Sequence, residues 1–425
     1  MKLDYKRTIL VGFAFFLICA FWQAYDTIVP LILTNKFGMD QTASGIIMAL
    51  DNIVAVFALP FFGNLSDKTR TRYGKRTPYI FFGTIVASLA LSALGFAGTL
   101  PLFLAFLLLA LISMATFRSP AVALMPDVTV KPLRSKGNAV INLMGTAGGI
   151  VILVLAMIFG TGAEGKTDFR AYLVSVSAVM LLALLVFLFT VREPAWSAEA
   201  EKAAATMADE EREERRASGG KLSRGQMASL LLILASVALW YIGYNSITSK
   251  YSLYATNILG VSYSLTLMIA QGAAVISYIP VGFLASRIGR KKSILAGVAL
   301  LTFSFAAGYF VEPGSSTLLM VVIFALAGIA WATINVNSFP MVVELAQGSD
   351  VGKYTGYYYT ASMAAQVITP IFSGALYDRF GMRNVFFPYA AIACGLAFFT
   401  MLFVRHGDAN PAPKAGLEAL DVADD

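Results

Sequence analysis

The chain has 425 residues, of which 58% are hydrophobic and only 13% are charged, and its mean hydropathy is +0.71. A soluble domain has about a quarter of its residues charged, so this composition excludes a water-soluble fold and predicts a protein solvated by lipid. The net charge of +7 is spread over short loops between apolar runs, which argues against a nucleic-acid-binding surface.

Twelve apolar runs follow one another along the chain. A bilayer-crossing helix needs about twenty apolar residues, and backbone groups in hydrocarbon must bond internally, so each run is predicted to be a helix rather than a barrel strand. The first run continues past Arg7 without a cleavage site and is therefore predicted to be an uncleaved crossing. The runs cover residues 8–34, 42–66, 78–98, 101–125, 137–160, 170–191, 226–254, 262–286, 292–311, 315–342, 353–378 and 384–404.

Twelve crossings place both termini on the same side of the membrane. With the termini inside, only five of the 32 Lys and Arg residues fall in outside loops, and two, Arg118 and Lys250, lie within helices. This asymmetry predicts an inner (plasma) membrane protein with both termini in the cytoplasm. Lys250 lies near the outer end of its helix and is expected to extend its amine to the interface.

One long polar segment separates the first six crossings from the last six. It carries the mixed-charge run 209–216, which is typical of a solvated helix or a flexible tether. The predicted organisation is a six-helix bundle over 1–191, a charged cytoplasmic linker over 192–225, a second six-helix bundle over 226–404 and a disordered acidic tail over 405–425.

The two halves contain matching segments. Tyr25 in the segment Trp22–Ile28 corresponds to Tyr244 in the segment Trp240–Ile247, and Gly63 corresponds to Gly282, both at an offset of 219 residues. Two distant segments that share one offset indicate an internal repeat. Paired six-helix halves with a binding site near the bilayer midplane are typical of secondary transporters.

Three ionisable residues, Asp26, Asp51 and Arg118, lie deep inside predicted crossings. Such a residue costs about 2.5–3.5 kcal/mol to insert and is therefore a candidate for function. Helix geometry places Asp26 and Asp51 at similar depths, about 12 and 14 Å below the outer ends of their helices. Two carboxylates near one cation predict a cluster that couples a proton or orients a substrate. The alternative is a structural ion pair that locks three helices together.

Planar polar side chains and aromatic rings within the helices are candidate sugar contacts. Each of them is also compatible with ordinary helix packing. The polar candidates are Gln23, Asn52, Asn142, Asn245, Asn335, Asn337 and Gln366, and the aromatic candidates are Trp22, Trp240, Tyr244, Trp331 and Tyr358. Three glycines of the fifth run, Gly145, Gly148 and Gly149, allow close helix approach, which generic packing explains equally well.

The loop after the second crossing is predicted to act as a gate. Asp67 ends this helix, where its charge can meet basic groups and helix termini. Such pairs would break on opening and form a latch, although the basic residues could instead serve only as anchors on the inner side. Ser286 replaces the acid in the second half, so that copy is expected to be weaker. The predicted latch residues are Gly63, Asp67, Arg72, Gly74 and Arg76 of this loop, with Asp127 and Glu344 near other cytoplasmic loops.

This loop resembles the signature loop of the major facilitator superfamily, and the resemblance covers essentially the whole chain. Its lengthened form, residues 66–79, together with Arg118-Ser119-Pro120 and Met125-Pro126-Asp127, is similar to the sugar:cation symporter branch, which includes glycoside–pentoside–hexuronide permeases and sucrose-type carriers. The resemblance implies the major facilitator fold of two six-helix bundles, in which helices one and four line a central cavity, and a carrier that works as a monomer by alternating access.

One departure from this branch bears on the coupling ion. Melibiose-type sodium permeases carry an Asp pair one turn apart on helix two, just before a proline. Measured from Pro60, those positions are Leu59 and Ala55 in this chain. That form of sodium site is therefore missing from the sequence, and the expected coupling ion is a proton.

No enzyme constellation is recognisable in the sequence. The single histidine, His406, follows the last crossing, Cys19 and Cys394 lie in apolar runs, and no phosphate-binding glycine loop occurs. The sequence thus predicts no enzyme and no cofactor, but a proton-coupled symporter of a di- or oligosaccharide in the lipid bilayer. An efflux or lipid carrier of the same fold is the alternative. A carrier-shaped sensor is disfavoured, because residues 192–225 are too few for a folded cytoplasmic domain.

Overall fold

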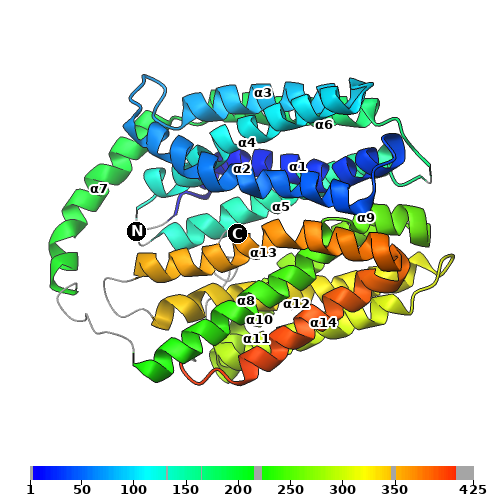
Figure 1. Ribbon diagram of the computed structural model, residues 1–425. Coiled ribbons are helices and arrows are strands. Elements are labelled where there is room, and N and C mark those ends of the chain that lie inside the picture. Colours follow the sequence, from blue (N-terminus) through cyan, green and yellow to red (C-terminus); the bar gives the residue numbers. More distant parts are fainter. Residues whose placement is uncertain (1–2, 131–132, 164, 215–222, 346–350, 408–425) are drawn as a thin grey trace. The chain divides into compact units, whose positions relative to one another are not determined.

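The computed structural model describes residues 3–130, 133–163, 165–214, 223–345 and 351–407. Contacts divide the chain into two units: unit 1 comprises Met1–Met39 and Leu50–Asp209, and unit 2 comprises Asp40–Ala49 and Glu210–Asp425. Within the described ranges all regular elements are helical (Figure 1). Residues 215–222 of the predicted linker, the loop residues 346–350 and residues 408–425 of the predicted acidic tail lie outside the described part of the chain.

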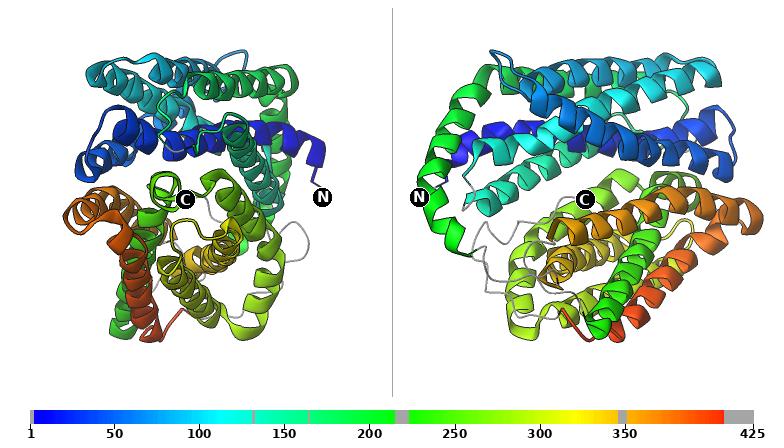
Figure 2. Two further views of the ribbon diagram at one scale, coloured as in Figure 1. Left: turned by 90° about the vertical axis from the view of Figure 1, so that its right-hand side faces the viewer. Right: turned by 60° about the vertical axis from the view of Figure 1, so that its left-hand side comes forward.

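Unit 1 is built around two helices. Its elements are α1 (Tyr5–Leu31), the π-helical turn η1 (Ile32–Lys36), α2 (Gln41–Lys68, whose first turns belong to unit 2), α3 (Thr77–Phe96), α4 (Leu100–Val128), α5 (Arg134–Ile158), α6 (Arg170–Thr190) and α7 (Glu193–Glu214, whose last turn belongs to unit 2). α1 packs against α4, α5 and α6, and α3 packs against α4 and α6. Figures 1 and 2 show these long helices running side by side in blue and cyan.

Unit 2 repeats the same packing. Its elements are α8 (Arg224–Thr248), α9 (Tyr251–Tyr254), the π-helical turn η3 (Ala255–Leu259), α10 (Tyr263–Ile288), α11 (Arg290–Tyr309), α12 (Thr317–Leu345), α13 (Val351–Phe380) and α14 (Met382–Leu402). α8 packs against α12, α13 and α14, and α11 packs against α12 and α14. These pairs correspond to those of α1 and α3 in unit 1, which confirms the internal repeat predicted from the sequence.

Eleven of the described helices are long and apolar enough to cross a membrane. α13 is the other long helix of unit 2. It has 30 residues, but Lys353 and the run Tyr357–Tyr359 make it less apolar. Its contact with α8 corresponds to that of α5 with α1, so its length and its place in the repeat identify it as the twelfth crossing. The described part of the chain is thus all-α, with eleven apolar crossings and α13 as the twelfth, as predicted.

Local sequence signals explain where several helices begin and end. The Asp4 carboxylate accepts a hydrogen bond from the Arg7 backbone N–H and caps α1, and Ser223 forms a capping box with Gln226 at the start of α8. Pro78 lies in the first turn of α3, where its missing N–H has no helical partner to lose. η3 ends at Leu259 and is followed by Gly260, whose φ of +68° favours glycine.

The polar linker is only partly solvated. Its described part forms α7, in agreement with the helix that was one of its two predicted forms, but two side chains of the first turn are buried against unit 1. The exposed fraction is 2% for Glu193 and 9% for Trp196. Figure 2 shows α7 leaving unit 1 at the end where α3 begins. The mixed charges of residues 209–216 gave no sign of this docked turn, because it lies outside them.

The expectation for Lys250 is wrong. Its side chain is fully buried, in the turn between α8 and α9, and does not extend to an interface. Its Nζ donates hydrogen bonds to the backbone oxygen and the side-chain Oε1 of Gln41, at 2.7 and 2.8 Å. A buried amine needs such partners because unpaired burial is costly.

A first prediction concerns the packing of α1 against α5. A Cβ on Gly148 would lie 2.5 Å from the backbone oxygen of Phe16, so Gly148→Ala must push these helices apart. We expect the free energy of unfolding to fall by about 1–3 kcal/mol. The melting temperature of the purified protein in detergent measures this. Gly272→Ala in α10 is the control, because a Cβ there meets nothing within 4 Å. Equal melting temperatures for the two variants would contradict the prediction.

Candidate transport site

Unit 1 brings the three predicted membrane charges together. Asp26 lies on α1, Asp51 on α2 and Arg118 on α4, and all three side chains are partly exposed. The charge of Asp51 acts on Asp26, and the charge of Arg118 acts on Asp51. Three helices that are separated in sequence thus contribute one group of interacting charges. Its role in coupling or substrate binding stays a prediction.

An aromatic ring adjoins this charge cluster. The guanidinium of Arg118 lies 5.5 Å from the centroid of the Trp22 ring, a distance suited to a cation–π interaction. Trp22 and Asp26 are four residues apart on α1, so they share one face of that helix. Tyr25 packs edge-to-face against Trp22, with ring centroids 5.3 Å apart. The face of α1 that carries Asp26 therefore combines a carboxylate with an aromatic surface.

The remaining polar candidates of unit 1 lie on the same group of helices. Asn52 adjoins Asp51, and its Nδ2 donates a 2.8 Å hydrogen bond to the Asp51 carboxylate. Gln23 on α1 and Asn142 on α5 are both partly exposed, and these two helices pack against each other. Asn52 is thus directly linked to the cluster, whereas Gln23 and Asn142 lie on its supporting helices.

Unit 2 presents stacked aromatic rings instead of charges. Tyr244 of α8 and Trp331 of α12 stack with centroids 3.6 Å apart and an interplanar angle of 5°. Tyr241 packs edge-on against the same indole at 5.2 Å. Tyr244 and Trp331 remain partly exposed, so their stack forms part of an accessible surface. We refer to Tyr241, Tyr244 and Trp331 as the aromatic stack.

Two predicted amides lie next to the aromatic stack. Asn335 follows Trp331 by one helical turn and is 8% exposed, and its Oδ1 has no hydrogen-bond partner among the described residues. A buried acceptor without a donor costs about 1–3 kcal/mol, so this atom is suited to a hydroxyl donor from outside the protein. Asn245 follows Tyr244 and donates from Nδ2 to the backbone oxygen of Tyr241 at 2.8 Å. Its amide nitrogen is therefore engaged within α8.

Other predicted sugar contacts are part of the core of unit 2. Trp240 and Asn337 are fully buried and Tyr358 is 1% exposed. Asn337 donates from Nδ2 to the backbone oxygen of Thr333, and the Tyr358 hydroxyl lies 3.0 Å from the Ser338 hydroxyl. The Oδ1 of Asn337 and the Nε1 of Trp240, like the Oδ1 of Asn335, have no hydrogen-bond partner among the described residues. The role of Trp240, Asn337 and Tyr358 as sugar contacts stays a prediction.

The predicted latch loop is organised around Arg76. This guanidinium, 4% exposed, donates from Nε to Asp127 at 2.7 Å and from its terminal nitrogens to Asp67 and to the Ser66 hydroxyl. Lys75 forms a second ion pair with Asp127 at 3.2 Å. Burial lowers the pKa of Arg76, but Asp127 and Asp67 more than offset this and raise it, so the side chain stays charged. All these partners belong to unit 1.

Gly63 at the end of α2 and Gly74 in the loop are each required to be glycine, for different steric reasons. Gly63 allows α2 to approach α4, since a Cβ there would lie 2.7 Å from the Ser119 hydroxyl. Gly74 has a φ of +108°, and a Cβ would collide with the Glu193 carboxylate. Arg72 instead packs on the ring of Tyr73, 4.6 Å from its centroid, outside the Arg76 network. The side chain of Glu344 lies outside the described residues.

Sequence reasoning missed the importance of Glu193. Its carboxylate accepts hydrogen bonds from the backbone N–H groups of Lys75, Arg76 and Thr77 and from the Thr77 hydroxyl, at 2.7–2.9 Å. The backbone N–H groups at the start of α3 have no acceptor within the helix, and a negative charge is favourable there. The first turn of α7 thereby fixes the loop that carries Arg76. A glutamate directly before Pro194 was the only available signal, and it is not specific.

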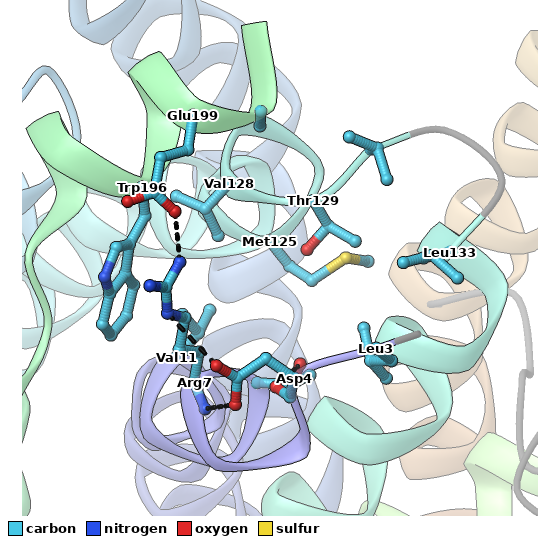
Figure 3. A pocket seen from close by; sticks show the side chains of 13 residues that line it. Leu3, Asp4, Arg7, Val11, Met125, Val128, Thr129, Leu133, Trp196 and Glu199 are labelled. Atoms are coloured by element: carbon cyan, nitrogen blue, oxygen red, sulfur yellow. Dashed lines mark hydrogen bonds and ion pairs between the residues drawn. The ribbon is translucent and has the colours of Figure 1, made fainter. Parts of the chain in front are cut away.

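A separate cavity of about 170 Å³ lies at one end of unit 1 (Figure 3). The start of α1, the end of α4 and the first turns of α7 line it. Figure 3 shows Arg7 pointing toward Glu199 and Asp4, at 2.5 and 3.2 Å, with Trp196 beside it. This cavity is lined by other parts of the helices than the charge cluster, and its charged groups are paired with one another. Among the described residues no group of three or more His, Cys, Asp or Glu side chains could hold a metal ion.

Comparison with known proteins identifies the family. Residues 10–351 match the family described as MFS/sugar transport protein. The chain belongs to this family. It is a family of transporters rather than of enzymes, and its members cross the membrane many times, which agrees with the helices described above.

Relatives match either most of the chain at low identity or shorter segments at higher identity. The probable metabolite transport protein CsbC of Bacillus subtilis is 22% identical over 410 residues, which are 88% of this chain and 85% of that protein. The MFS-type transporter ppzB of Metarhizium rileyi is 30% identical over 115 residues, which are 27% of this chain and 23% of that protein. The sucrose transport protein SUC3 of Arabidopsis thaliana is 29% identical over 160 residues, 32% of this chain and 25% of that protein. The chain thus matches only a minor part of the length of the last two relatives.

The whole fold is shared with solved transporters. The xylose transporter XylE from E. coli, in an inward open conformation, aligns with a TM-score of 0.66 at 14% identity and covers 98% of this chain and 99% of that one. An identity this low shows the common fold alone. The family match over residues 10–351 confirms the predicted superfamily, and this shared structure confirms the predicted fold.

A second prediction tests the contact between α7 and the Arg76 loop. Glu193→Gln keeps one acceptor oxygen but turns an NH₂ group toward backbone donors. We expect it to lower the free energy of unfolding by about 1–3 kcal/mol, seen as a lower melting temperature. Glu201→Gln, at an exposed position of the same helix, is the matched control. If both variants melt together, the Glu193 hydrogen bonds contribute nothing to holding the loop.

Proposed function

We propose that the protein is a proton-coupled symporter of a neutral di- or oligosaccharide that works by alternating access. The charge cluster of Asp26, Asp51 and Arg118 carries this proposal. Charges inside membrane helices are costly to place and are retained where they bind ions or substrates. The family to which the chain belongs, described as MFS/sugar transport protein, supports a small solute as cargo.

The cluster is suited to holding one proton. Two carboxylates that interact in a poorly hydrated site resist being ionised together, while a nearby cation favours one of them as a carboxylate. Asp51 interacts with both other charges, whereas Asp51 is the charge that acts on Asp26. Asp26 is therefore proposed as the group that takes up the proton. Asp51 is proposed to transmit its state to Arg118.

The aromatic stack supports a neutral sugar as the solute. Solute pockets combine apolar and aromatic surface with a few polar groups that fix orientation. Unit 2 offers the partly exposed rings of Tyr244 and Trp331 and the unsatisfied oxygen of Asn335. At the offset of 219 residues, Asp26 and Arg118 correspond to Asn245 and Asn337, so these positions of unit 2 are uncharged. The similarity to a sucrose transport protein agrees with this class of solute.

The proposed setting is the inner (plasma) membrane, with both termini in the cytoplasm. The distribution of Lys and Arg over the loops supports this orientation. It places the Arg76 network and α7 on the cytoplasmic side and the connection between α1 and α2 on the outer side. We propose that the protein works as a monomer and without a cofactor, with a proton as the only coupling ion.

A third prediction tests the coupling group. In proteoliposomes with an imposed pH gradient, the parent protein should accumulate labelled sucrose or maltose. Asp26→Asn and Asp51→Asn should each abolish accumulation while leaving downhill flux measurable, because the Asn side chain cannot exchange a proton.

The control is Asp168→Asn, which alters an exposed carboxylate beside Arg170 outside the membrane spans. It should accumulate solute like the parent. Accumulation by both cluster variants would exclude these carboxylates as the proton carriers. Flux in the outward direction only would favour an efflux carrier instead.

A fourth prediction tests the aromatic stack. Trp331→Ala removes the ring that contacts Tyr244 and Tyr241, and we expect the KM for sucrose to rise about tenfold, the upper range for one aromatic contact. Trp331→Phe should restore most of this loss. Phe303→Ala, at an exposed position of α11, serves as the control. An unchanged KM for Trp331→Ala would place the solute elsewhere.

A further inference from the structure

The first turns of α2 are packed within unit 2 by polar contacts at their N-terminus. The Asp378 carboxylate, in the last turns of α13, accepts hydrogen bonds from the backbone N–H groups of Gln41 and Thr42, at 2.8 and 2.7 Å, and from the Thr42 hydroxyl. A carboxylate at this position satisfies free donors of the helix and interacts favourably with its dipole. Asp378 thus caps α2 from another helix.

Lys250 holds the same turn from the other side. Its Nζ donates to both oxygens of Gln41, so the peptide groups at Gln41 are bound by an acid and by an amine at once. The carboxylates that act on the Lys250 charge are Asp378 and Asp40. Lys250 is fully buried, although a lysine at a helix end usually extends its amine into water. Its hydrogen bonds to Gln41 therefore determine its position.

Glycines allow α2 and α13 to approach each other here. A Cβ on Gly45 would lie 2.0 Å from the backbone oxygen of Pro370, and a Cβ on Gly374 would lie 2.3 Å from the backbone oxygen of Gln41. Both distances are far inside van der Waals contact. The polar contacts of Gln41 therefore depend on a close approach that only glycine permits at these two positions.

This arrangement has no counterpart in the other half of the repeat. At the offset of 219 residues, Lys250 corresponds to Leu31 and Asp378 to Phe159, neither of which can form such bonds. The contacts are therefore a specific addition to unit 2 rather than a consequence of the repeated fold.

We infer that Lys250 and Asp378 form a releasable clasp on the first turn of α2, positioning that helix in one state of the transport cycle and freeing it in another. The inference rests on the proposed alternating access. α2 passes into unit 1 at Leu50, and Asp51 follows directly, so the clasp lies about 15 Å along the helix from the charge cluster. The clasp consists of a few hydrogen bonds. Asp378 is exposed and Gln41 is partly exposed, so water can replace these bonds when the contact breaks.

The first test does not require the solute. Cys19 and Cys394 are replaced by Ala, and Thr42→Cys is labelled with a maleimide in the purified full-length protein. With Lys250→Met, labelling should become about tenfold faster, because a charge-assisted contact that covers this turn is lost. Lys36→Met is the matched control, since Lys36 bonds to the Ala97 backbone oxygen in unit 1, and it should leave the rate unchanged. Equal rates of maleimide labelling in the proteins with and without Lys250→Met would overturn the clasp.

The second test asks whether release is needed for transport. In the same background, oxidation of the pair Thr42→Cys and Asp378→Cys should stop labelled sucrose uptake, and reduction should restore it. The control pair, Ser236→Cys and Thr400→Cys, joins α8 to α14, where the two hydroxyls lie 2.7 Å apart, and should retain uptake when oxidised.

Uptake that continues with the Thr42–Asp378 pair fully cross-linked, or failure of that pair to cross-link at all, would overturn the inference. If the parent protein carries no sucrose, the proposed function fails in its solute, while the maleimide rates still decide whether the clasp exists.

Discussion

The cost of placing charge in hydrocarbon organises this protein. Within the described membrane-crossing helices, charged side chains lie mostly near the helix ends, and only a few positions are charged in the interior. Asp26, Asp51 and Arg118 interact with one another in unit 1, and Lys250 finds two oxygens of Gln41 in unit 2. Because each such residue lowers the stability of the membrane fold, its retention requires a compensating contact or a function.

The internal repeat provides one scaffold for two different surfaces. Corresponding helix pairs pack in both units, yet Asn245 stands in the position of Asp26 and Ser286 in that of Asp67. Unit 1 therefore carries the interacting charges and the Arg76 network, while unit 2 carries the aromatic stack. This difference supports the proposal that unit 1 binds the coupling ion and unit 2 contacts the solute.

The helices could be predicted from sequence because their signal is local. Apolar length gives each crossing, and the observed helices agree with the predicted runs to within a few residues, except where 226–254 breaks into α8, α9 and η3. Helix depth predicted that Asp26 and Asp51 lie near one level. It placed Arg118 further toward the cytoplasmic side, so the effect of Arg118 on Asp51 depends on how α2 and α4 pack. The aromatic candidates were named individually, but their stacking depends on which faces of α8 and α12 meet.

The contacts that sequence reasoning missed join residues far apart in the chain. Glu193 bonds to a loop more than a hundred residues earlier, and Lys250 bonds to Gln41 across about two hundred. A glutamate in a polar linker and a lysine at a helix end each have a simpler local explanation, as a solvated group and an interfacial anchor. Only the tertiary packing, including the close approach allowed by Gly45 and Gly374, shows which explanation holds.

The central claim is that sugar entry carries a proton through the Asp26–Asp51–Arg118 cluster. The most direct measurement is the external pH of a weakly buffered proteoliposome suspension when sucrose is added without any imposed gradient. The account predicts that the medium becomes more alkaline as sucrose enters, and that a protonophore abolishes this change. Sucrose entry at an undiminished rate with no change in external pH would contradict it.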